Sequence, residues 1–452
     1  MRIIVIGCGK IGETLVGRFV YEGHDVVAVD LRTDVVTDLS NRYDVMCVCG
    51  NAVDCDTLRE AGAETAALLV AVTGSDERNM LCCFLAKRMG AKHTIARIRN
   101  PEFNDASLAF IQNELGLSMA INPELLAAQE IYNLLKLPSA AKVEYFSRRR
   151  FEMIELRLRE GSPLCNLSLQ ELRGRYSASF LVCVVQRGAD VIIPDGSFVL
   201  RSGDRIGLTA HPVEMEKLFK SIGIANKRAR SIMLLGGSKT AYYLSKLLLG
   251  SGSRVKLIDI DREVCRRFRA ELPALTAIHG DGTHQELLLE EGLLEQDAFV
   301  SLTGLDEQNI LLAFYAASQQ VPKVIAKVNR DEMTALADRL GLDTLISPKE
   351  ITANVLVGYA RALQNSLGSS IETLYQLMDG KAEALEFIVK DAAAFTNVPL
   401  RELSLRPNIL IAGIIRDRRT IIPSGDDRIL PGDRVVVIAA AQRLNTLKDI
   451  LR

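Results

Sequence analysis

The second half of this 452-residue chain repeats the first half at a period of about 230 residues. Six blocks of sequence recur in the same order in both halves. Three of the six pairs are IVIGCGKIG (4–12) with MLLGGSKTA (233–241), VTGSDERNM (72–80) with LTGLDEQNI (302–310), and IPDGSFVLRSGDR (193–205) with IPSGDDRILPGDR (422–434). A repeat of this length predicts that each half forms the same fold, so an architecture proposed for one half has to serve for the other.

Each half begins with about 120 residues in which short runs rich in Val, Ile and Leu alternate with amphipathic stretches of helical period. This alternation is typical of β-α units on a parallel sheet that is buried on both faces. In the first half, the expected strands are residues 2–6, 25–29, 45–49, 68–72 and 94–97. An apolar helix should follow at residues 123–137, with Pro123 at the favoured first turn.

A different pattern follows a basic run of three arginines at residues 148–150. Ile154, Leu156 and Leu158 alternate with charged side chains, which predicts a strand with one face in solvent. Turns at residues 187–188 and 195–196 separate further short strands. These features predict a small α+β domain of about 80 residues.

The first strand ends in a glycine motif that is typical of dinucleotide-binding proteins. Gly7, Gly9 and Gly12 have the spacing G-x-G-x-x-G between a strand and a helix expected at residues 10–21. Gly7 permits a tight turn, Gly9 lets a pyrophosphate approach the backbone, and Gly12 allows close packing of helix on strand. Asp30 ends the second strand about 20 residues further on, where an acidic residue binds a ribose hydroxyl and disfavours the 2′-phosphate of NADP. The set predicts an adenine-nucleotide site.

Three further residues should border the same crevice at the carboxyl edge of the sheet. Asn51 follows the third strand, Thr73 the fourth, and Arg97 ends the fifth. Thr73 with Asp76 is also interpreted as a helix cap with acidic residues in the first turn. Arg97 is suited either to a phosphate or to an acidic partner, and the sequence does not choose between them.

The second half departs from the glycine motif. Gly236 is kept, but Ser238 replaces the middle glycine and Ala241 the last. A serine side chain intrudes where a pyrophosphate should meet backbone, although its hydroxyl can donate to a phosphate. Asp259 stands as far from Gly236 as Asp30 stands from Gly7. We therefore expect a weaker or altered second nucleotide site.

These patterns predict an α/β protein with two tandem Rossmann-like, doubly wound parallel-sheet domains, each followed by a small α+β domain. A charged linker, residues 224–230, should join the halves. The expected boundaries are sheet domains at 1–120 and 231–347, linking helices at 121–140 and 348–370, and small domains at 141–225 and 371–452.

The linking helices, expected at residues 123–137 and 349–367, are more apolar than a surface helix requires. In the second, an apolar face is suggested by residues four apart, with two more leucines beside them: Ile351, Val355, Tyr359 and Leu363, with Leu356 and Leu367. Packing on the helix's own domain and an interface between subunits are equally compatible with this pattern.

Composition excludes several classes of function. Lys plus Arg number 55 against 56 for Asp plus Glu, without the basic excess of a nucleic-acid-binding protein. No apolar run reaches the ~18 residues of a membrane span, and the N-terminus is not typical of a signal peptide, so we expect a cytoplasmic protein. The nine cysteines lack C-x-x-C spacing and the five histidines are scattered, so we expect neither a metal site nor disulfides.

In combination, the opening IVIGCGKIG, Asp30, GNAVD at residues 50–54, VTGSDERNM and IPDGSFVLRSGDRI resemble the RCK (also called KTN) domains that regulate potassium channels and transporters. Two full copies in one chain are similar to the peripheral subunits of Trk-type potassium-uptake systems, and the resemblance covers nearly the whole chain. It implies binding of NAD(H), or of ATP or ADP. It also implies a homo-oligomer, dimer or tetramer, docked on a membrane-embedded potassium-transporter subunit of the TrkH or TrkG type at the inner face of the membrane.

The resemblance also implies two sets of nucleotide-binding residues. The first is Gly7, Cys8, Gly9, Lys10, Ile11, Gly12, Asp30, Asn51, Thr73 and Arg97. The second is Gly236, Gly237, Ser238, Lys239, Thr240, Asp259, Thr303 and Lys327. His284 stands opposite Asp54, which is a further departure in the second copy.

Two other functions remain open at this stage. Most proteins with this glycine motif are nicotinamide-dependent oxidoreductases. However, no separate substrate domain or acid/base pair is evident, and His24 and His93 lie outside the expected crevice loops. The chain is also compatible with the regulatory subunit of another potassium transport or efflux system. We expect a regulatory protein and no catalytic residues.

Overall fold

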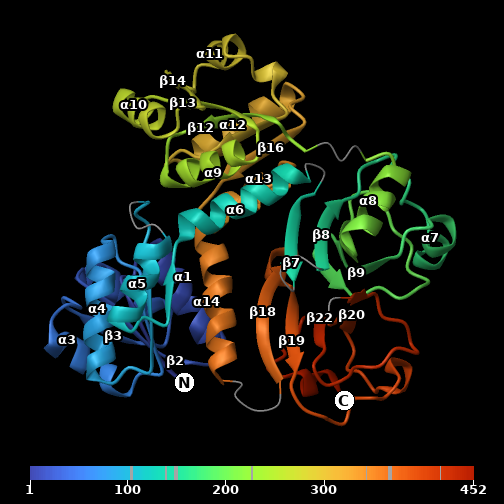
Figure 1. The fold of residues 1–452 in the computed structure, drawn as a ribbon, viewed down its shortest axis with the longest axis horizontal. Helices are drawn as coiled ribbons and strands as arrows, with labels where there is room; N and C mark the ends of the chain where they lie inside the picture. The colour runs from blue at the N-terminus through green and yellow to red at the C-terminus, as the bar shows by residue number, and fades with distance from the viewer. Residues whose placement is uncertain are drawn as a thin grey trace.

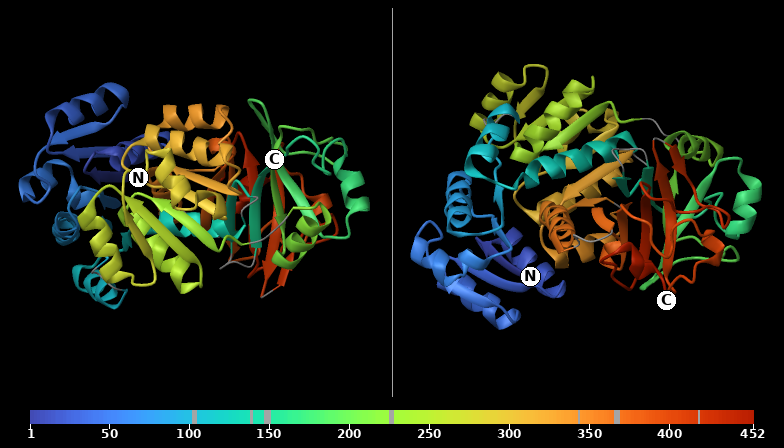
Figure 2. Two further views of the ribbon diagram at one scale, coloured as in Figure 1. Left: turned by 90° about the horizontal axis from the view of Figure 1, so that it is seen from above. Right: turned by 60° about the horizontal axis from the view of Figure 1, so that its bottom comes forward.

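The computed structural model describes residues 1–101, 105–137, 140–146, 151–224, 228–342, 344–364, 369–417 and 419–452. A sheet domain, a long helix and a small domain follow one another along the chain, and the same series then repeats (Figure 1). The two sheet domains lie on one side of the molecule and the two small domains on the other (Figure 2). The arginines at residues 148–150 lie outside the described residues, as do residues 225–227 of the expected linker.

The first sheet domain is an open sheet of six parallel strands in the spatial order β3-β2-β1-β4-β5-β6. Its strands are β1 (Arg2–Ile6), β2 (Asp25–Asp30), β3 (Met46–Cys49), β4 (Leu68–Ala71), β5 (His93–Arg97) and β6 (Met119–Ile121). Its helices are α1 (Lys10–Tyr21), α2 (Thr33–Arg42), α3 (Cys55–Glu60), α4 (Asp76–Met89) and α5 (Asp105–Leu115). Strand order reverses between β1 and β4, which creates a crevice at their carboxyl ends. The three-residue strand β6 is too short to show a periodic pattern and was not predicted.

The second sheet domain repeats this topology in the order β14-β13-β12-β15-β16-β17. Its strands are β12 (Ser231–Leu235), β13 (Arg254–Asp259), β14 (Thr276–His279), β15 (Ala298–Ser301), β16 (Lys323–Lys327) and β17 (Leu345–Ile346). Its helices are α9 (Lys239–Gly250), α10 (Arg262–Glu271), α11 (Gln285–Glu290), α12 (Asp306–Ser318) and α13 (Asp331–Arg339). The prediction of two like folds is confirmed.

Each small domain contains a five-stranded antiparallel sheet, in the orders β10-β9-β11-β8-β7 and β18-β19-β22-β20-β21. The first is built from β7 (Lys142–Phe146), β8 (Phe151–Arg157), β9 (Phe180–Arg187), β10 (Asp190–Ile192) and β11 (Arg205–Ala210), with helices α7 (Leu169–Arg175) and α8 (Pro212–Ser221). The second is built from β18 (Ser369–Leu377), β19 (Ala382–Val389), β20 (Ile409–Arg416), β21 (Arg419–Ile421) and β22 (Arg434–Ala440).

Strand β8 does not have a solvent face, so the expectation of a half-exposed strand is wrong. Glu155, which the alternation assigns to solvent, is buried. The reason is that the two small domains pack against each other through a common core that includes Met153 and Leu377. The carboxylate of Glu155 is satisfied there by Arg205, with Nη2 to Oε2 at 3.0 Å, and by the amide of Met378 at 3.3 Å.

The two linking helices cross between the halves. Helix α6 (Pro123–Lys136) packs on α9 of the second sheet domain, where Ile131 and Leu244 share one core. Helix α14 (Pro348–Gln364) packs on α1 of the first sheet domain, where Leu356 and Leu15 share another. Figure 1 shows α14 beside the blue first sheet domain and α6 beside the second. Helix α14 also contacts β18 of the small domain in its own half. Packing within the chain therefore covers part of both helices, and an interface between subunits stays a prediction.

The buried face of α14 also differs from the expected one. Leu356, which was expected beside the apolar face, is buried together with Ala353, Val357 and Ala360, whereas Val355 is 37% exposed. Small alanines allow close approach to α1, and a pattern weighted on large side chains misses them. The part of the expected helix beyond Gln364, residues 365–367, lies outside the described residues.

A buried ion-pair network joins the first sheet domain, α14 and the second small domain. Arg361 of α14 is 1% exposed. Its Nε and Nη2 donate to Glu22, after α1, at 2.6 and 2.7 Å, and its Nη1 and Nη2 donate to Glu383 of β19 at 2.8 and 2.9 Å. We call this set the Arg361 network. Arg18 of α1 and Glu350 of α14 form a second ion pair between the same helices, at 2.6 Å.

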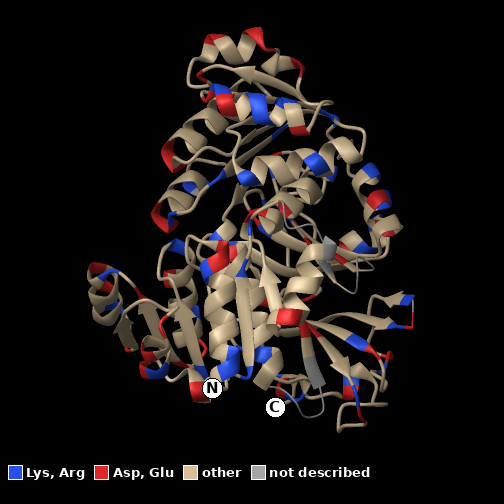
Figure 3. Cartoon of the chain, turned by 60° about the vertical axis from the view of Figure 1, so that its left-hand side comes forward, with Lys and Arg blue, Asp and Glu red and all other residues tan. Residues whose placement is uncertain are grey.

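Two properties of the whole molecule bear on its partners. Lys and Arg are interspersed with Asp and Glu over all the domains in the view of Figure 3, with no basic face of the kind that nucleic acids require. Within the described parts of the chain, no helix combines the length and the apolar character needed to cross a membrane.

Candidate functional site

The glycine loop after β1 is shaped by three different requirements. Gly7 has a positive φ of 88°, and a Cβ on it would lie 2.8 Å from the backbone of Thr73. A Cβ on Gly12 would lie 2.0 Å from the carbonyl oxygen of Gly7. Gly9 has an ordinary φ of −71°, and no atom lies within 4 Å of its Cβ position. Gly7 and Gly12 therefore allow the loop to form, whereas Gly9 leaves open space above the loop.

The N-termini of the two equivalent helices differ in how they are capped. Gly9 has no side chain to cap α1, so the first N–H groups of that helix are available to an anion. In the second half, Ser238 Oγ accepts from the amide of Ala241 at 3.3 Å and caps α9. The serine that we expected either to obstruct or to contact a phosphate thus serves as a helix cap in this structure.

The aspartate at the end of the second strand is held against the glycine loop in both halves. Asp30 Oδ2 accepts from the amide of Cys8 at 2.7 Å, and Oδ1 accepts from the amide of Arg32 at 2.9 Å. Asp259 accepts from the amide of Gly237 at 2.5 Å in the same way. The carboxylate is therefore fixed at the crevice edge. The Cys8 thiol is buried below it, and burial raises the pKa of that thiol to about 12.

A fully buried amide, Asn79, organises the loop after β4. Its Oδ1 accepts from the amide and hydroxyl of Thr73 at 2.8 and 2.6 Å. Its Nδ2 donates to the carbonyls of Thr73 at 3.3 Å and of Arg97 at 2.9 Å. Asn79 therefore holds the ends of β4 and β5 together beneath the crevice. Asn309 makes the same four contacts with Thr303 and Lys327 in the second half.

The helix cap expected at Thr73 and Asp76 is formed differently. Ser75 caps α4 by accepting from the amide of Arg78 at 3.2 Å. Asp76 is buried and accepts from the amide of Arg99 at 2.7 Å, with the Arg99 guanidinium at 3.2 Å. The buried carboxylate thus binds the segment after β5 instead of its own helix terminus.

Residues of both halves line one cavity of about 750 Å³ between the sheet domains. From the first predicted set, it contains Gly7, Gly9, Lys10, Ile11, Asp30, Asn51, Thr73 and Arg97. From the second set, it contains Ser238, Lys239, Thr240 and Lys327. A cavity of this size fits a nucleotide. The sequence analysis treated the two sets as two sites, and the structure brings members of both together.

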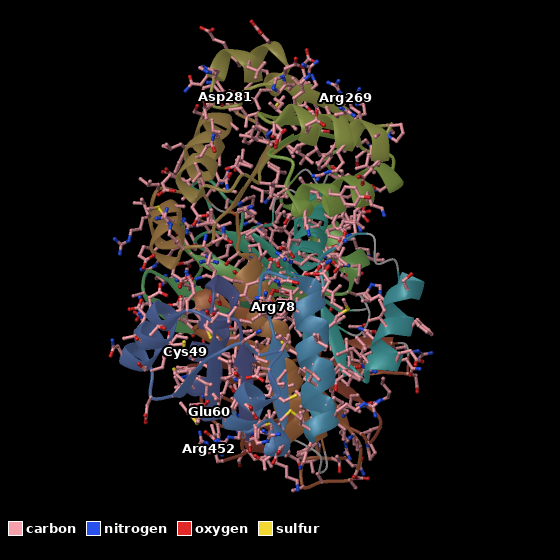
Figure 4. The ribbon with its side chains drawn as sticks, turned by 90° about the vertical axis from the view of Figure 1, so that its left-hand side faces the viewer. Cys49, Glu60, Arg78, Arg269, Asp281 and Arg452 are labelled. Atoms are coloured by element: carbon pink, nitrogen blue, oxygen red, sulfur yellow. The ribbon has the colours of Figure 1, made fainter. Side chains whose placement is uncertain are left out.

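The remaining residues of the predicted sets lie outside this cavity. Cys8 and Gly12 are buried in the first glycine loop. In the second half, a Cβ on Gly237 would lie 2.2 Å from Val264 Cγ1, so that loop is packed against α10. In Figure 4, Arg78 lies at the border between the sheet domains, whereas Asp281, the counterpart of Asn51, lies toward the far end of the second. Gly236, Gly237, Asp259 and Thr303 are likewise not among the described residues that line the cavity.

The lining of the cavity is strongly cationic. Its eight basic side chains are Lys10, Arg32, Arg78, Arg97, Arg99, Lys239, Lys327 and Lys349, against two acidic ones, Asp30 and Glu124. Such a concentration of positive charge favours a ligand with several negative charges, because low-dielectric walls focus the field. Four of the eight, Lys10, Arg97, Lys239 and Lys327, belong to the predicted sets, whereas Arg32, Arg78, Arg99 and Lys349 were not predicted.

Two of the basic groups are buried at the base of the cavity. Arg97 Nε has no hydrogen-bond partner among the described residues, and burial lowers the pKa of the guanidinium. Lys327 Nζ donates to the carbonyl of Leu302 at 3.2 Å, and burial lowers its pKa as well. Arg97 Nε is therefore open to either of its two expected roles, contact with a phosphate or with an acidic partner. An anion in the cavity would satisfy both groups.

A tyrosine joins the two halves at the rim. The Tyr243 hydroxyl, from α9, donates to the carbonyl of Arg99 at 2.8 Å and accepts from Asn122 Nδ2 at 3.0 Å. The sequence analysis did not identify Tyr243, Arg99 or Asn79 as site residues. Of these three, only Asn79 has a signal in the sequence: the spacing from Thr73 to Asn79 is repeated from Thr303 to Asn309.

Two open parallel sheets with glycine loops, each followed by a small antiparallel domain, define a protein of two tandem RCK units. Family models agree with this assignment. Residues 3–123 and 232–348 match the TrkA-N domain, and residues 153–223 and 384–452 match the TrkA-C domain. These matches cover more than half of the chain, which therefore belongs to the TrkA family.

Relatives and solved structures give the same family and fold. The chain is 31% identical to a "Trk system potassium uptake protein TrkA homolog" of Archaeoglobus fulgidus over 100% of both chains. It is 29% identical to the "Trk system potassium uptake protein TrkA" of Haemophilus influenzae over 97% of this chain and 95% of the relative. The GsuK RCK domain superposes with a TM-score of 0.63 at 18% identity, covering 97% of this chain and 92% of that one. The GsuK channel bound to NAD gives a TM-score of 0.62 at 18% identity, over 97% and 77%.

Proposed function

We propose that this protein is the nucleotide-sensing regulatory subunit of a Trk-type potassium-uptake system. The observation that carries this proposal is the cationic cavity above Gly9, which combines an open glycine loop, an uncapped helix terminus and eight basic side chains. NAD(H), ATP and ADP all match its size and charge. The names of the curated relatives supply the transport system.

A ligand bound in this cavity would change the position of the two halves relative to each other. Lys239, Lys327 and Lys349 reach the cavity from the second half, while Lys10 and Arg97 reach it from the first. A polyanion between them would neutralise both groups of charges and draw the sheet domains together. A ligand shifts a conformational equilibrium only by binding one state more tightly, and charges from two bodies provide that difference.

This motion would control ion flow through a contact between this protein and a membrane protein. We propose a cytoplasmic location, peripheral to the membrane, with a membrane-embedded potassium-transporter subunit of the TrkH or TrkG type as the partner. A ring of several copies would transmit the motion. The relatives' names support the potassium system, and the family resemblance implies the oligomer.

Nucleotide binding should depend on Gly9 more than on its counterpart. Because the Cβ of Gly9→Ala meets no atom in the ligand-free fold, we expect unchanged thermal stability. The methyl group would stand where a pyrophosphate approaches, so affinity for NADH, NAD, ATP or ADP should fall about tenfold or more. Thermal unfolding measures the stability, and calorimetric titration measures the affinity. Ser238→Gly is the matched control, and it should retain or strengthen binding. Unchanged affinity in Gly9→Ala would place the main site elsewhere.

Oligomer assembly should depend on the exposed leucines of α12 and α13. Leu311 is 68% exposed and Leu340, at the end of α13, is also exposed. Leu311→Asp should therefore reduce the oligomer to a smaller species without changing thermal stability, as measured by light scattering after gel filtration. Ile260→Asp, at a residue that follows β13, is a control of the same exposure, 68%. A wild-type chain that is already monomeric at micromolar concentration would contradict the proposal.

The oxidoreductase alternative makes a different prediction. Hydride transfer requires a general acid or base beside the nicotinamide. The titratable groups that line the cavity are eight cations and two carboxylates, and no histidine is among them. We propose that the protein binds the cofactor without turning it over. Sustained oxidation of NADH with any common carbonyl substrate would favour the enzyme.

A further inference from the structure

A second cavity of about 1050 Å³ lies between the first small domain and the second sheet domain. On one side, it is lined by the end of β8 and the loop that follows it. On the other side, it is lined by the segments that lead into β16 and β17. None of the predicted nucleotide-binding residues lines it. It borders the amino ends of the parallel strands, whereas the nucleotide cavity borders their carboxyl ends.

One strand connects the two cavities. Lys323, the first residue of β16, lines the second cavity, and Lys327, the last residue of β16, lines the nucleotide cavity. A five-residue strand spans about 13 Å between its first and last Cα atoms. Lys323 is buried, and its Nζ donates to the carbonyl of Ala140 at 2.6 Å and to Thr344 Oγ1 at 2.8 Å. The strand is therefore fixed to the small-domain wall of the second cavity.

The lining combines positive charge with apolar surface. The basic side chains are Arg157, Arg159 and Lys323, and the acidic ones are Glu160 and Asp297. Asp297 is already engaged, because its Oδ2 accepts from the backbone amides that begin β12 at 2.7 and 2.9 Å. The apolar part of the wall consists of Leu156, Leu158, Val321, Pro322 and Leu342. This combination suits an anionic group attached to an apolar body.

The corresponding positions of the other half have different residues. In the β8–β11 pairing, Arg157 stands opposite Arg205, and in the β19–β22 pairing, Ile388 stands opposite Arg434. An apolar residue thus replaces Arg157 at the equivalent position. The counterpart of Lys323 is His93, which begins β5 and packs edge-on against the ring of Tyr359 of α14. Arg159 is the exception, because Lys390 stands at its equivalent position, so the second cavity differs from its counterpart by the charges of Arg157 and Lys323.

We propose that this cavity is a binding site for a small water-soluble organic anion, a carboxylate, sulfonate or phosphate monoester with an apolar body, with one site per chain. Arg157 and Arg159 would bind the anionic group, and the leucine-rich wall would cover the apolar body. The ligand would contact the first small domain and the second sheet domain at once, and would restrain their relative motion. Through β16, its occupancy would change affinity at the nucleotide cavity, a coupling that rests on the proposed function.

The test uses the full chain and anilinonaphthalene sulfonate as the probe, since it combines a sulfonate with an aromatic body and fluoresces in apolar sites. Titrations are done with ADP present, so that the nucleotide cavity is occupied. Ala317 is exposed and lines the cavity, whereas Ser318 is exposed but does not line it. Ala317→Trp therefore narrows the cavity without entering the core, and Ser318→Trp is the matched control.

We expect one saturable probe site per chain in the wild type and in Ser318→Trp. In Ala317→Trp, probe affinity should fall about tenfold, and in Arg157→Gln/Arg159→Gln about tenfold or more, since the double substitution removes the charge-assisted contacts to the anionic group. Equal affinity in Ala317→Trp and the wild type would overturn the site. Binding of phosphatidylglycerol vesicles that Ala317→Trp abolishes would overturn the assignment to a soluble ligand.

The coupling is measured separately as the dissociation constant for ADP with and without saturating probe. A change of about fivefold or more that disappears in Ala317→Trp supports transmission through β16. An unchanged constant would overturn the coupling. If the chain binds no nucleotide at all, the proposed function fails, while the probe titrations, repeated without ADP, still decide on the second cavity.

Discussion

Arg361→Met is expected to lower the free energy of unfolding by about 3–5 kcal/mol, the usual effect of removing one partner from a buried ion pair. The substitution leaves the carboxylates of Glu22 and Glu383 without a cation, and both side chains are at most 10% exposed. Methionine approximates the length of the arginine stem and leaves little empty space. The loss of free energy of unfolding therefore arises mainly from the unpaired carboxylates. Urea denaturation followed by circular dichroism measures the effect.

Two further variants separate charge from packing. Arg361→Met/Glu22→Gln/Glu383→Gln removes the whole Arg361 network, and should recover part of the stability that Arg361→Met alone loses. Lys136 occupies the equivalent position at the end of α6, is only half-buried, and has its Nζ 4.0 Å from the ring centroid of Tyr132. Lys136→Met should therefore cost less than ~1 kcal/mol. A loss below that value in Arg361→Met would show that the network does not stabilise the crossed arrangement.

The second large effect is expected from Asn79→Ala. The substitution removes the fully buried amide of Asn79 and with it four hydrogen bonds to backbone and hydroxyl groups of Thr73 and Arg97. Each group left unsatisfied costs about 1–3 kcal/mol, and partial entry of water offsets some of this, so we expect a loss of about 2–4 kcal/mol. Because the Thr73 loop and the end of β5 then separate, nucleotide affinity should fall about tenfold or more.

The duplication supplies the control for this second result. Asn309→Ala breaks the same four contacts around Thr303 and Lys327, and should lower stability by a similar amount. Because Asn309→Ala leaves the Thr73 loop in place, nucleotide affinity should change less than in Asn79→Ala. Thermal unfolding and calorimetric titration of both variants make the comparison. Equal loss of affinity in the two variants would mean that the halves contribute equally to the nucleotide site.

The sheet domains could be predicted because their signals are local. A buried parallel strand appears as a short apolar run, and a glycine with positive φ, such as Gly7, stands at a fixed spacing from the strand it follows. The repeat doubled each of these signals. Strand β8 was misjudged because the alternation Ile154, Glu155, Leu156 does not reveal that a second sheet covers the polar side.

The residues that the sequence did not reveal have roles that depend on how the chain folds around them. Asn79 lies near the start of a helix, where a polar residue is usually solvated, and only the fold places it under the Thr73 loop. Arg361 resembles an ordinary basic residue in the last turn of a helix, yet its carboxylate partners are Glu22 and Glu383. The shared cavity arises because α6 and α14 cross, which no periodicity predicts.

The crossing of α6 and α14 also determines when a newly made chain can finish folding. The first sheet domain leaves the ribosome long before α14, whose Leu356 completes the core around Leu15. Until α14 is synthesised, the apolar face of α1 and the unpaired carboxylate of Glu22 remain without their native cover, and the nascent chain is exposed to aggregation. A gene truncated between the halves would leave its product in that incomplete state permanently.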